Sequence, residues 1–105
     1  MDLRVLGTAL DLFAVLDPTH LYAHHIQVFL VIAQEGPCTL KVIEDRLNLS
    51  NSAVSRTVQA LGAINRKGQP GFDLVTVERD PEEGRRFLVM LTSRGHALAR
   101  QIEAL

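Results

Sequence analysis

The residues between 51 and 63 that could do chemistry share one face of a predicted helix. At about 100° per residue, this face carries small polar groups and a single arginine. Its members are Ser52, Ser55, Arg56, Gln59 and Ala63, and Asn51 at the start of the helix is a further candidate DNA-binding residue. Arginine can hold guanine through two acceptors, glutamine can hold adenine in the same way, and serine hydroxyls can reach phosphates or base edges. The face could therefore read the major groove of duplex DNA; the alternative is the solvated face of an ordinary surface helix.

A second group of candidate residues lies between 79 and 86, where basic and acidic side chains are mixed. The basic members are Arg79, Arg85 and Arg86, and the acidic members are Asp80, Glu82 and Glu83. Pro81 and Gly84 favour a turn in this segment. The basic tip of a hairpin can reach the minor groove, where negative potential attracts arginine. The alternative is a mixed-charge hairpin that only keeps the chain soluble.

The net charge of −1 argues against nucleic-acid binding, but the distribution of charge argues for it. Residues 1–49 carry three basic and six acidic groups, whereas residues 50–95 carry seven basic and five acidic groups. Positive charge therefore gathers where the two candidate groups lie. Because the excess is modest, we expect affinity for DNA to fall noticeably as salt rises.

The remaining polar residues do not indicate catalysis or a bound cofactor. His20 and His24 have the spacing of helical zinc ligands, but no third ligand follows at a clear spacing, so we expect solvated or partly packed histidines. Cys38 precedes a predicted helix that could lower its pKa and make it redox-responsive; the simpler expectation is a small, partly buried residue. We expect no enzyme activity, no metal and no cofactor.

Composition predicts one globular domain over residues 1–105. Hydrophobic residues make up 47% of the chain, and so few are aromatic that the core must be mainly aliphatic. The N-terminus lacks the pattern of a signal peptide, and no apolar run approaches the roughly 18 residues of a membrane span. Together with a single cysteine, these features predict a cytoplasmic protein.

Apolar periodicity, caps and turn residues divide the chain into helices and strands. Helices are predicted at 1–16, 19–35, 39–47, 51–64 and 92–105, strands at 72–79 and 86–91, and a polar loop at 65–71. Val54, Val58 and Leu61 form the buried stripe of the fourth helix. Two helices joined by a short turn and followed by a hairpin predict a mainly helical α+β fold, a winged helix-turn-helix of order α-α-α-α-β-β-α.

Two segments together resemble MarR-type regulators. Leu47-Asn-Leu-Ser-Asn-Ser-Ala-Val-Ser-Arg-Thr-Val-Gln-Ala-Leu61 is similar to the family's recognition helix, and residues 74–95 resemble its wing and the "leu-thr-x-x-gly" exit. The resemblance covers about residues 26–105. It implies a dimeric DNA-binding repressor or activator. Its implied DNA contacts are Ser52, Ser55, Arg56 and Gln59, with Arg85 as the wing-tip arginine and Arg86 close behind.

The sequence departs from the family pattern in four places. The chain and its last helix are short, and the loop at 65–71 is long. Glu83-Gly84 stands where the family usually has an aspartate that braces the wing arginine. The family senses ligands between its dimerisation and DNA-binding parts, so a small-molecule effector stays an open question here.

The leading hypothesis is a homodimeric, sequence-specific regulator of transcription, with double-stranded DNA as its partner and repression as its expected action. The helices at 1–16 and 92–105 would form the dimer, because their apolar stripes exceed what one small domain can cover. One alternative is a winged-helix protein-interaction module. Another is a DNA-binding factor for replication or recombination.

Overall fold

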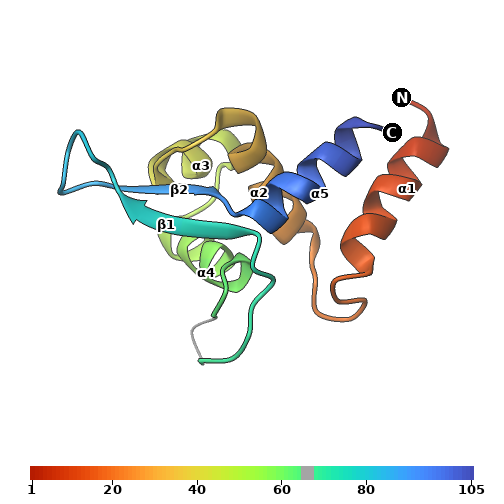
Figure 1. Ribbon diagram of the computed structural model, residues 1–105, viewed down its shortest axis with the longest axis horizontal. Helices are drawn as coiled ribbons and strands as arrows, with labels where there is room; N and C mark the ends of the chain where they lie inside the picture. The colour runs from red at the N-terminus through yellow and green to blue at the C-terminus, as the bar shows by residue number, and fades with distance from the viewer. Residues whose placement is uncertain (65–67) are drawn as a thin grey trace.

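The computed structural model describes residues 1–64 and 68–105. Its elements are α1 (Leu3–Ala14), α2 (Ala23–Glu35), α3 (Leu40–Leu47), α4 (Asn51–Leu61), β1 (Val75–Arg79), β2 (Phe87–Leu91) and α5 (Ser93–Glu103) (Figure 1). This order confirms the predicted winged helix-turn-helix, in which four helices precede the hairpin and one follows it.

Helix α2 runs through the centre of the core. Val28, Phe29 and Ile32 are fully buried, and the helix packs against α3, α4 and β2. Aliphatic residues from the other elements complete the core, as the composition predicted. At one end of the molecule α1 lies beside α5, and at the other end the hairpin projects away from the helices (Figure 1). The pair of helices α1 and α5 is therefore separated in space from the hairpin, so the two could serve different functions.

Local capping builds the helix-turn-helix. The Thr39 hydroxyl accepts a hydrogen bond from the Val42 amide at 3.4 Å, and α3 ends at Asn48, whose φ of 54° is left-handed. The Ser50 hydroxyl then accepts from the Ala53 amide at 3.1 Å and starts α4. The turn between the helices is thus only residues 48–50, which fixes α4 against α2 and α3.

Helix α4 ends at Leu61, so the prediction of a helix to residue 64 is wrong by three residues. Gly62 is extended, and the chain returns to bond the end of the helix. The carbonyls of Ala60 and Leu61 accept from the amides of residues 72 and 74, at 3.1 and 2.8 Å. Gly71 fits this return because a Cβ there would lie 2.1 Å from the Gly62 oxygen. The predicted loop at 65–71 includes residues 65–67, which lie outside the described residues.

The hairpin is shorter than predicted, because residues 72–74 pair with the end of α4 instead of with β2. Its strands are antiparallel, with Val77 opposite Val89. Cys38 adds a bridge to the hairpin, donating to the Val89 carbonyl at 3.0 Å and accepting from its amide at 2.7 Å. Burial raises the pKa of the Cys38 thiol, and Glu35 raises it further, so the residue is a protonated part of the core.

The predicted start of α2 at Thr19 is also wrong. The Asp17 carboxylate accepts from the amides of Thr19 and His20, both at 3.0 Å, and forms a separate turn after α1. Helix α2 begins four residues later at Ala23, with Tyr22 as its N-cap. Helix α1 ends at Ala14, ahead of the predicted boundary at 16.

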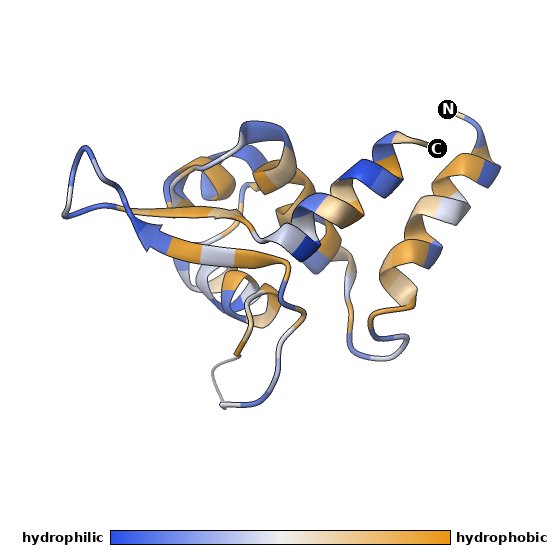
Figure 2. Cartoon of the chain, viewed as in Figure 1, coloured by the Kyte–Doolittle hydropathy of each residue, from blue (hydrophilic) through white to orange (hydrophobic). Residues whose placement is uncertain are grey.

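Much of α1 is hydrophobic and faces solvent (Figure 2). Phe13 is its one buried residue, whereas Leu3, Leu6 and Leu10 are 81%, 41% and 44% exposed. Every helix within the described residues is nevertheless too short or too polar to cross a membrane.

Candidate nucleic-acid interface

Helix α4 separates its candidate residues from the core as its periodicity predicted. Val54, Thr57, Val58 and Leu61 are buried, whereas Asn51, Ser52, Arg56 and Gln59 are exposed. Ser55 lies between these two groups and is half-buried. The helix therefore presents a polar outer face, and its buried face packs against α2 and α3.

The exposed residues of α4 differ in how far they are already engaged. The side-chain amide of Asn51 donates to the carboxylate of Glu44 in α3 at 3.0 Å. The Ser52 hydroxyl lies 3.4 Å from that of Ser50. The side chains of Arg56 and Gln59 make no hydrogen bond or ion pair with any residue in the described parts of the chain. The two longest polar side chains of this face keep their donors and acceptors available for a ligand.

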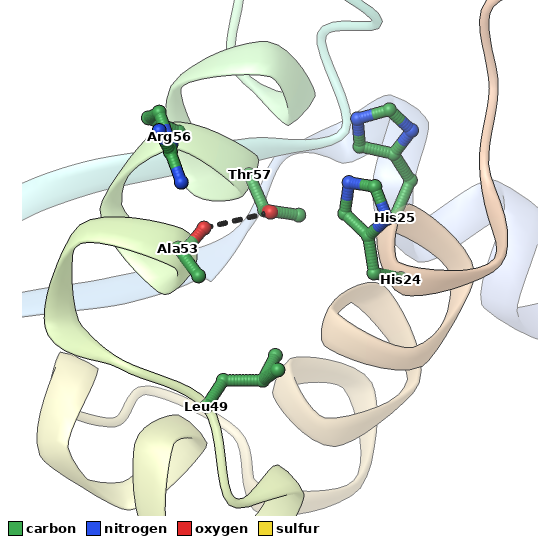
Figure 3. Close-up of a pocket in the computed structure, with 6 residues that line it drawn as sticks. All are labelled: His24, His25, Leu49, Ala53, Arg56 and Thr57. Atoms are coloured by element: carbon green, nitrogen blue, oxygen red, sulfur yellow. Dashed lines mark hydrogen bonds between the residues drawn. The ribbon is translucent and has the colours of Figure 1, made fainter.

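A cavity of about 350 Å³ lies between α4 and the start of α2. Arg56 and Thr57 line it from α4, and His24 and His25 from α2 (Figure 3). The Thr57 hydroxyl donates to the Ala53 carbonyl at 2.9 Å, so it is satisfied within its own helix. Arg56 thus borders both the outer face of α4 and this cavity.

His25 joins α2 to the rest of this region. It is 7% exposed, and its Nδ1 accepts a hydrogen bond from the amide of Tyr22, the N-cap residue of α2, at 2.9 Å, as in a capping box. Its ring lies 5.7 Å from that of Phe72 and 4.5 Å from that of His24. Burial lowers the pKa of His25, and the neighbouring His24 lowers it further, so the ring is neutral at neutral pH.

The turn of the wing is organised by Asp80, which the sequence analysis counted among the acidic residues of this segment but did not predict as a DNA contact. Asp80 is 5% exposed. Its Oδ2 accepts from Nε and NH2 of Arg86 at 3.0 and 2.6 Å, and its Oδ1 accepts from the Glu82 amide at 2.9 Å. The Arg86 hydrogen bonds hold the pKa of Asp80 below its usual value, and the same pair raises the pKa of Arg86. The Asp-Pro start of the turn is the sequence signal that could have identified Asp80.

The three wing arginines have different surroundings. Arg79 donates to the Gly84 carbonyl at 2.5 Å, and its guanidinium lies 5.2 Å from the centre of the Phe87 ring. Arg86 is paired with Asp80. Arg85 is exposed and makes no hydrogen bond or ion pair within residues 1–64 and 68–105.

Helix α4 and the wing border one another. A groove of about 210 Å³ runs between them, lined by Val58, Gly62 and Ala63 on one side and by Val75, Thr76 and Val77 on the other. The wing therefore leaves the core next to the C-terminal end of α4. The predicted site residues of the helix and the hairpin belong to neighbouring elements (Figure 1).

The histidines weighed as zinc ligands are engaged elsewhere. His20 lies outside α2 and its Nδ1 is 3.2 Å from the Asp17 carboxylate, so the helical spacing with His24 does not apply. Within the described residues, histidine, cysteine and acidic side chains nowhere gather in groups of three that could hold a metal ion.

Comparison of sequences identifies no relative, because no family model and no curated protein matches the chain. Comparison of structures, in contrast, identifies similar proteins. RV1404 from Mycobacterium tuberculosis is 22% identical with a TM-score of 0.72, and the alignment covers 96% of this chain and 63% of that one. A MarR-like transcriptional regulator from Thermotoga maritima is 26% identical with a TM-score of 0.67, covering 99% of this chain and 74% of the other.

A MarR variant from E. coli, in a crystal structure with operator DNA, is also similar. It is 24% identical with a TM-score of 0.65, and the alignment covers 97% of this chain and 68% of that one. The chain has the winged-helix fold of MarR-type regulators. It spans only about two thirds to three quarters of the length of these proteins.

Proposed function

We propose that the chain is a sequence-specific, double-stranded DNA-binding regulator of transcription that acts as a repressor. Helix α4 enters the major groove, and the segment 79–86 at the tip of the wing enters the adjacent minor groove. The observation that carries this proposal is the outer face of α4. There the side chains of Arg56 and Gln59 are exposed and have no partner among the described residues, while Val54 and Val58 anchor the helix behind them.

Each member of the face has a role that suits its surroundings. Arg56 and Gln59 have the donors and acceptors to read base edges. Ser52 and Asn51 lie in the first turn of α4, where backbone amides and short side chains can hold a phosphate. Ser55 is half-buried and small, which lets the helix approach the floor of the groove.

The proposal includes a homodimer. Leu3, Leu6 and Leu10 give α1 an exposed apolar face, and Leu105, two residues after the end of the neighbouring α5, is also exposed. A second copy of the same face would cover these residues. Two copies of α4 would then meet successive major grooves, about 34–36 Å apart, on a pseudo-palindromic site.

Two similar proteins support DNA binding. One is the E. coli MarR variant crystallised with operator DNA. The other is BpsR from Bordetella bronchiseptica, whose DNA binding is regulated by 6-hydroxynicotinic acid and which is 26% identical to this chain. Both share the fold that presents α4 and the wing.

A protein-interaction module is the second candidate function, because the net charge is −1 and the face of α1 is apolar. Retention on heparin at low salt separates the two candidates. A DNA-binding regulator should be retained and then eluted by salt, whereas a pure protein-interaction module should flow through.

Selection of bound sequences from a random duplex pool tests the proposed function. We expect enrichment of one motif with two-fold symmetry, and that symmetry would also support the homodimer. A pool that stays random after repeated rounds at low salt would contradict sequence-specific binding.

A further inference from the structure

We propose that Glu44 orients the side chain of Asn51 so that Asn51 reads an adenine in the major groove. The inference rests on the proposed DNA-binding function and assigns a base contact to the first residue of α4. Asn51 would be the contact residue, and Glu44 would be its positioning residue.

Glu44 lies in α3, one turn before that helix gives way to α4. Its backbone carbonyl accepts from the amides of Asn48 and Leu49, the latter at 3.1 Å. Its side chain is half-buried, and its Oε2 accepts from Nδ2 of the exposed Asn51 at 3.0 Å. One residue of α3 therefore holds both the turn and the first side chain of α4.

The carboxylate of Glu44 is available to Asn51 because the basic residues of α3 have other partners. Lys41 pairs with Asp45 at 3.1 Å, and the one other basic residue of this helix pairs with α2. Within residues 1–64 and 68–105, Asn51 is the one side chain that donates a hydrogen bond to this carboxylate. The contact therefore ties Asn51 to α3 without competition from a cation.

The hydrogen bond determines which way round the Asn51 amide lies. The reversed amide would place Oδ1 against the carboxylate of Glu44, and two acceptors repel one another. With Nδ2 facing Glu44, the side chain keeps Oδ1 and one amide hydrogen for a ligand. Adenine presents the matching groups in the major groove, because its N6 amino group donates and its N7 accepts.

The negative charge of Glu44 favours a base over a phosphate as the partner of Asn51. A phosphate held by the Asn51 side chain would lie close to this carboxylate, and the two negative groups would repel one another. A base edge is neutral and carries no such penalty. The phosphate proposed at the start of α4 is therefore left to Ser52 and the backbone amides, and Asn51 takes a base, as N-terminal residues of recognition helices do.

Two alanine variants test the contact and its positioning. Selection from the random duplex pool is repeated with Asn51→Ala and with Glu44→Ala. We expect both variants to lose, by several-fold, the preference for adenine at one and the same position of the site. Because Glu44 acts through Asn51, the double variant should lose no more of this preference than Asn51→Ala alone. A purely structural role of Glu44 would not be confined to one base position.

Asp45→Ala is the matched control, because it removes a carboxylate from the next residue of α3 and leaves the contact with Asn51 intact. Both Glu44→Ala and Asp45→Ala make the protein less acidic, so both should bind unrelated duplex more tightly. Only Glu44→Ala should also lose the adenine preference. Glu44→Gln keeps an acceptor without the charge, so it should restore most of the preference, and it replaces Glu44→Ala if alanine unfolds the protein.

A modified duplex tests the base contact without any change to the protein. The adenine at that position is replaced by 7-deazaadenine, in which a C–H group takes the place of the N7 acceptor. Fluorescence anisotropy should show that the parent binds the modified duplex several-fold more weakly. Asn51→Ala should bind the modified and unmodified duplexes equally.

The outcomes separate this inference from the function on which it rests. If the parent selects a motif and Asn51→Ala keeps every base preference, or Glu44→Ala keeps the preference that Asn51→Ala loses, the inference is wrong and the proposed function stands. A preference lost at a G·C pair, or equal binding of the parent to both duplexes, also overturns the inference alone. If the parent binds no duplex at any salt concentration, both are wrong.

Discussion

Arg56 and Val54 lie two residues apart on α4, and their surroundings show how one helix can be both core and interface. Val54 is fully buried between α4 and its neighbours, whereas Arg56 is exposed and unengaged by the described residues. The residue spacing alone predicted this difference, because it depends only on the helical repeat. It could not predict that Arg86 is paired while Arg85 is not, because that depends on where Asp80 lies in the folded turn.

We predict that Arg56→Ala weakens binding to the selected duplex by about 1–3 kcal/mol and relaxes sequence preference at one position of the site. The thermal midpoint should stay near that of the parent, because the Arg56 side chain is exposed and makes no hydrogen bond or ion pair with the described residues. Anisotropy titrations and thermal unfolding measure the two quantities. Arg94→Ala is the control, since Arg94 is an exposed arginine on α5 that borders α1 instead of α4. Equal affinity for Arg56→Ala and the parent would refute the role of Arg56.

At the scale of elements, caps explain which boundaries could be predicted. Thr39 and Ser50 stand directly before their helices and bond to them, so the starts of α3 and α4 follow from local sequence. Thr19 gives a similar signal, but Asp17 takes the amides around it into a turn of its own. Residues 72–74 directly precede a β-branched run and were predicted as the start of its strand, yet they bond to the end of α4. Local sequence does not reveal which partner a backbone amide finds in the folded chain.

The N-terminal cap of α2 makes stability depend on pH. The Nδ1 of His25 accepts from the Tyr22 amide only when the ring is neutral, because a protonated ring carries a hydrogen there. The pKa of His25 is lowered by burial from its ordinary value of 6.5, so the unfolded chain binds this proton more readily. The contribution of His25 to stability is therefore fully present above about pH 6.5 and is lost as the pH falls through the lowered pKa of the folded protein.

We predict that the free energy of unfolding falls between about pH 6.5 and pH 5, above the range in which carboxylates titrate. His25→Gln should remove this part of the fall, because glutamine can accept at the same position of a capping box but does not titrate. Urea unfolding at a series of pH values measures the free energy of unfolding of both proteins. The exposed His96 provides the control, and His96→Gln should keep the dependence of the parent. A pH profile that His25→Gln leaves unaltered would show that the cap does not titrate in this range.

At the scale of the whole molecule, the apolar face of α1 lies at the end opposite the wing (Figure 1). The periodicity of Leu3, Leu6 and Leu10 indicated an apolar stripe, and the structure leaves this stripe exposed. A monomer with this face in water carries an unfavourable exposed area that a second copy would remove. The dimer is the prediction that follows from this exposed stripe.

We predict that Leu6→Glu converts a dimeric parent into a monomer, since a carboxylate in the apolar face would lose its hydration on association. Sedimentation equilibrium measures the change in mass. Thr8→Glu is the matched control, because Thr8 is exposed and lies on the other side of α1 by the helical repeat. A parent that sediments as a monomer at all concentrations, or a Leu6→Glu protein that remains dimeric, would show that α1 does not form the predicted interface.

Mapping the surface that DNA contacts tests the central claim most directly. Backbone amide chemical shifts of the parent are followed by NMR while the selected duplex is added. The account predicts the largest changes at residues 50–59 and 82–86, the outer face of α4 and the tip of the wing. Changes confined to α1 and α5, with α4 unaffected, would contradict it.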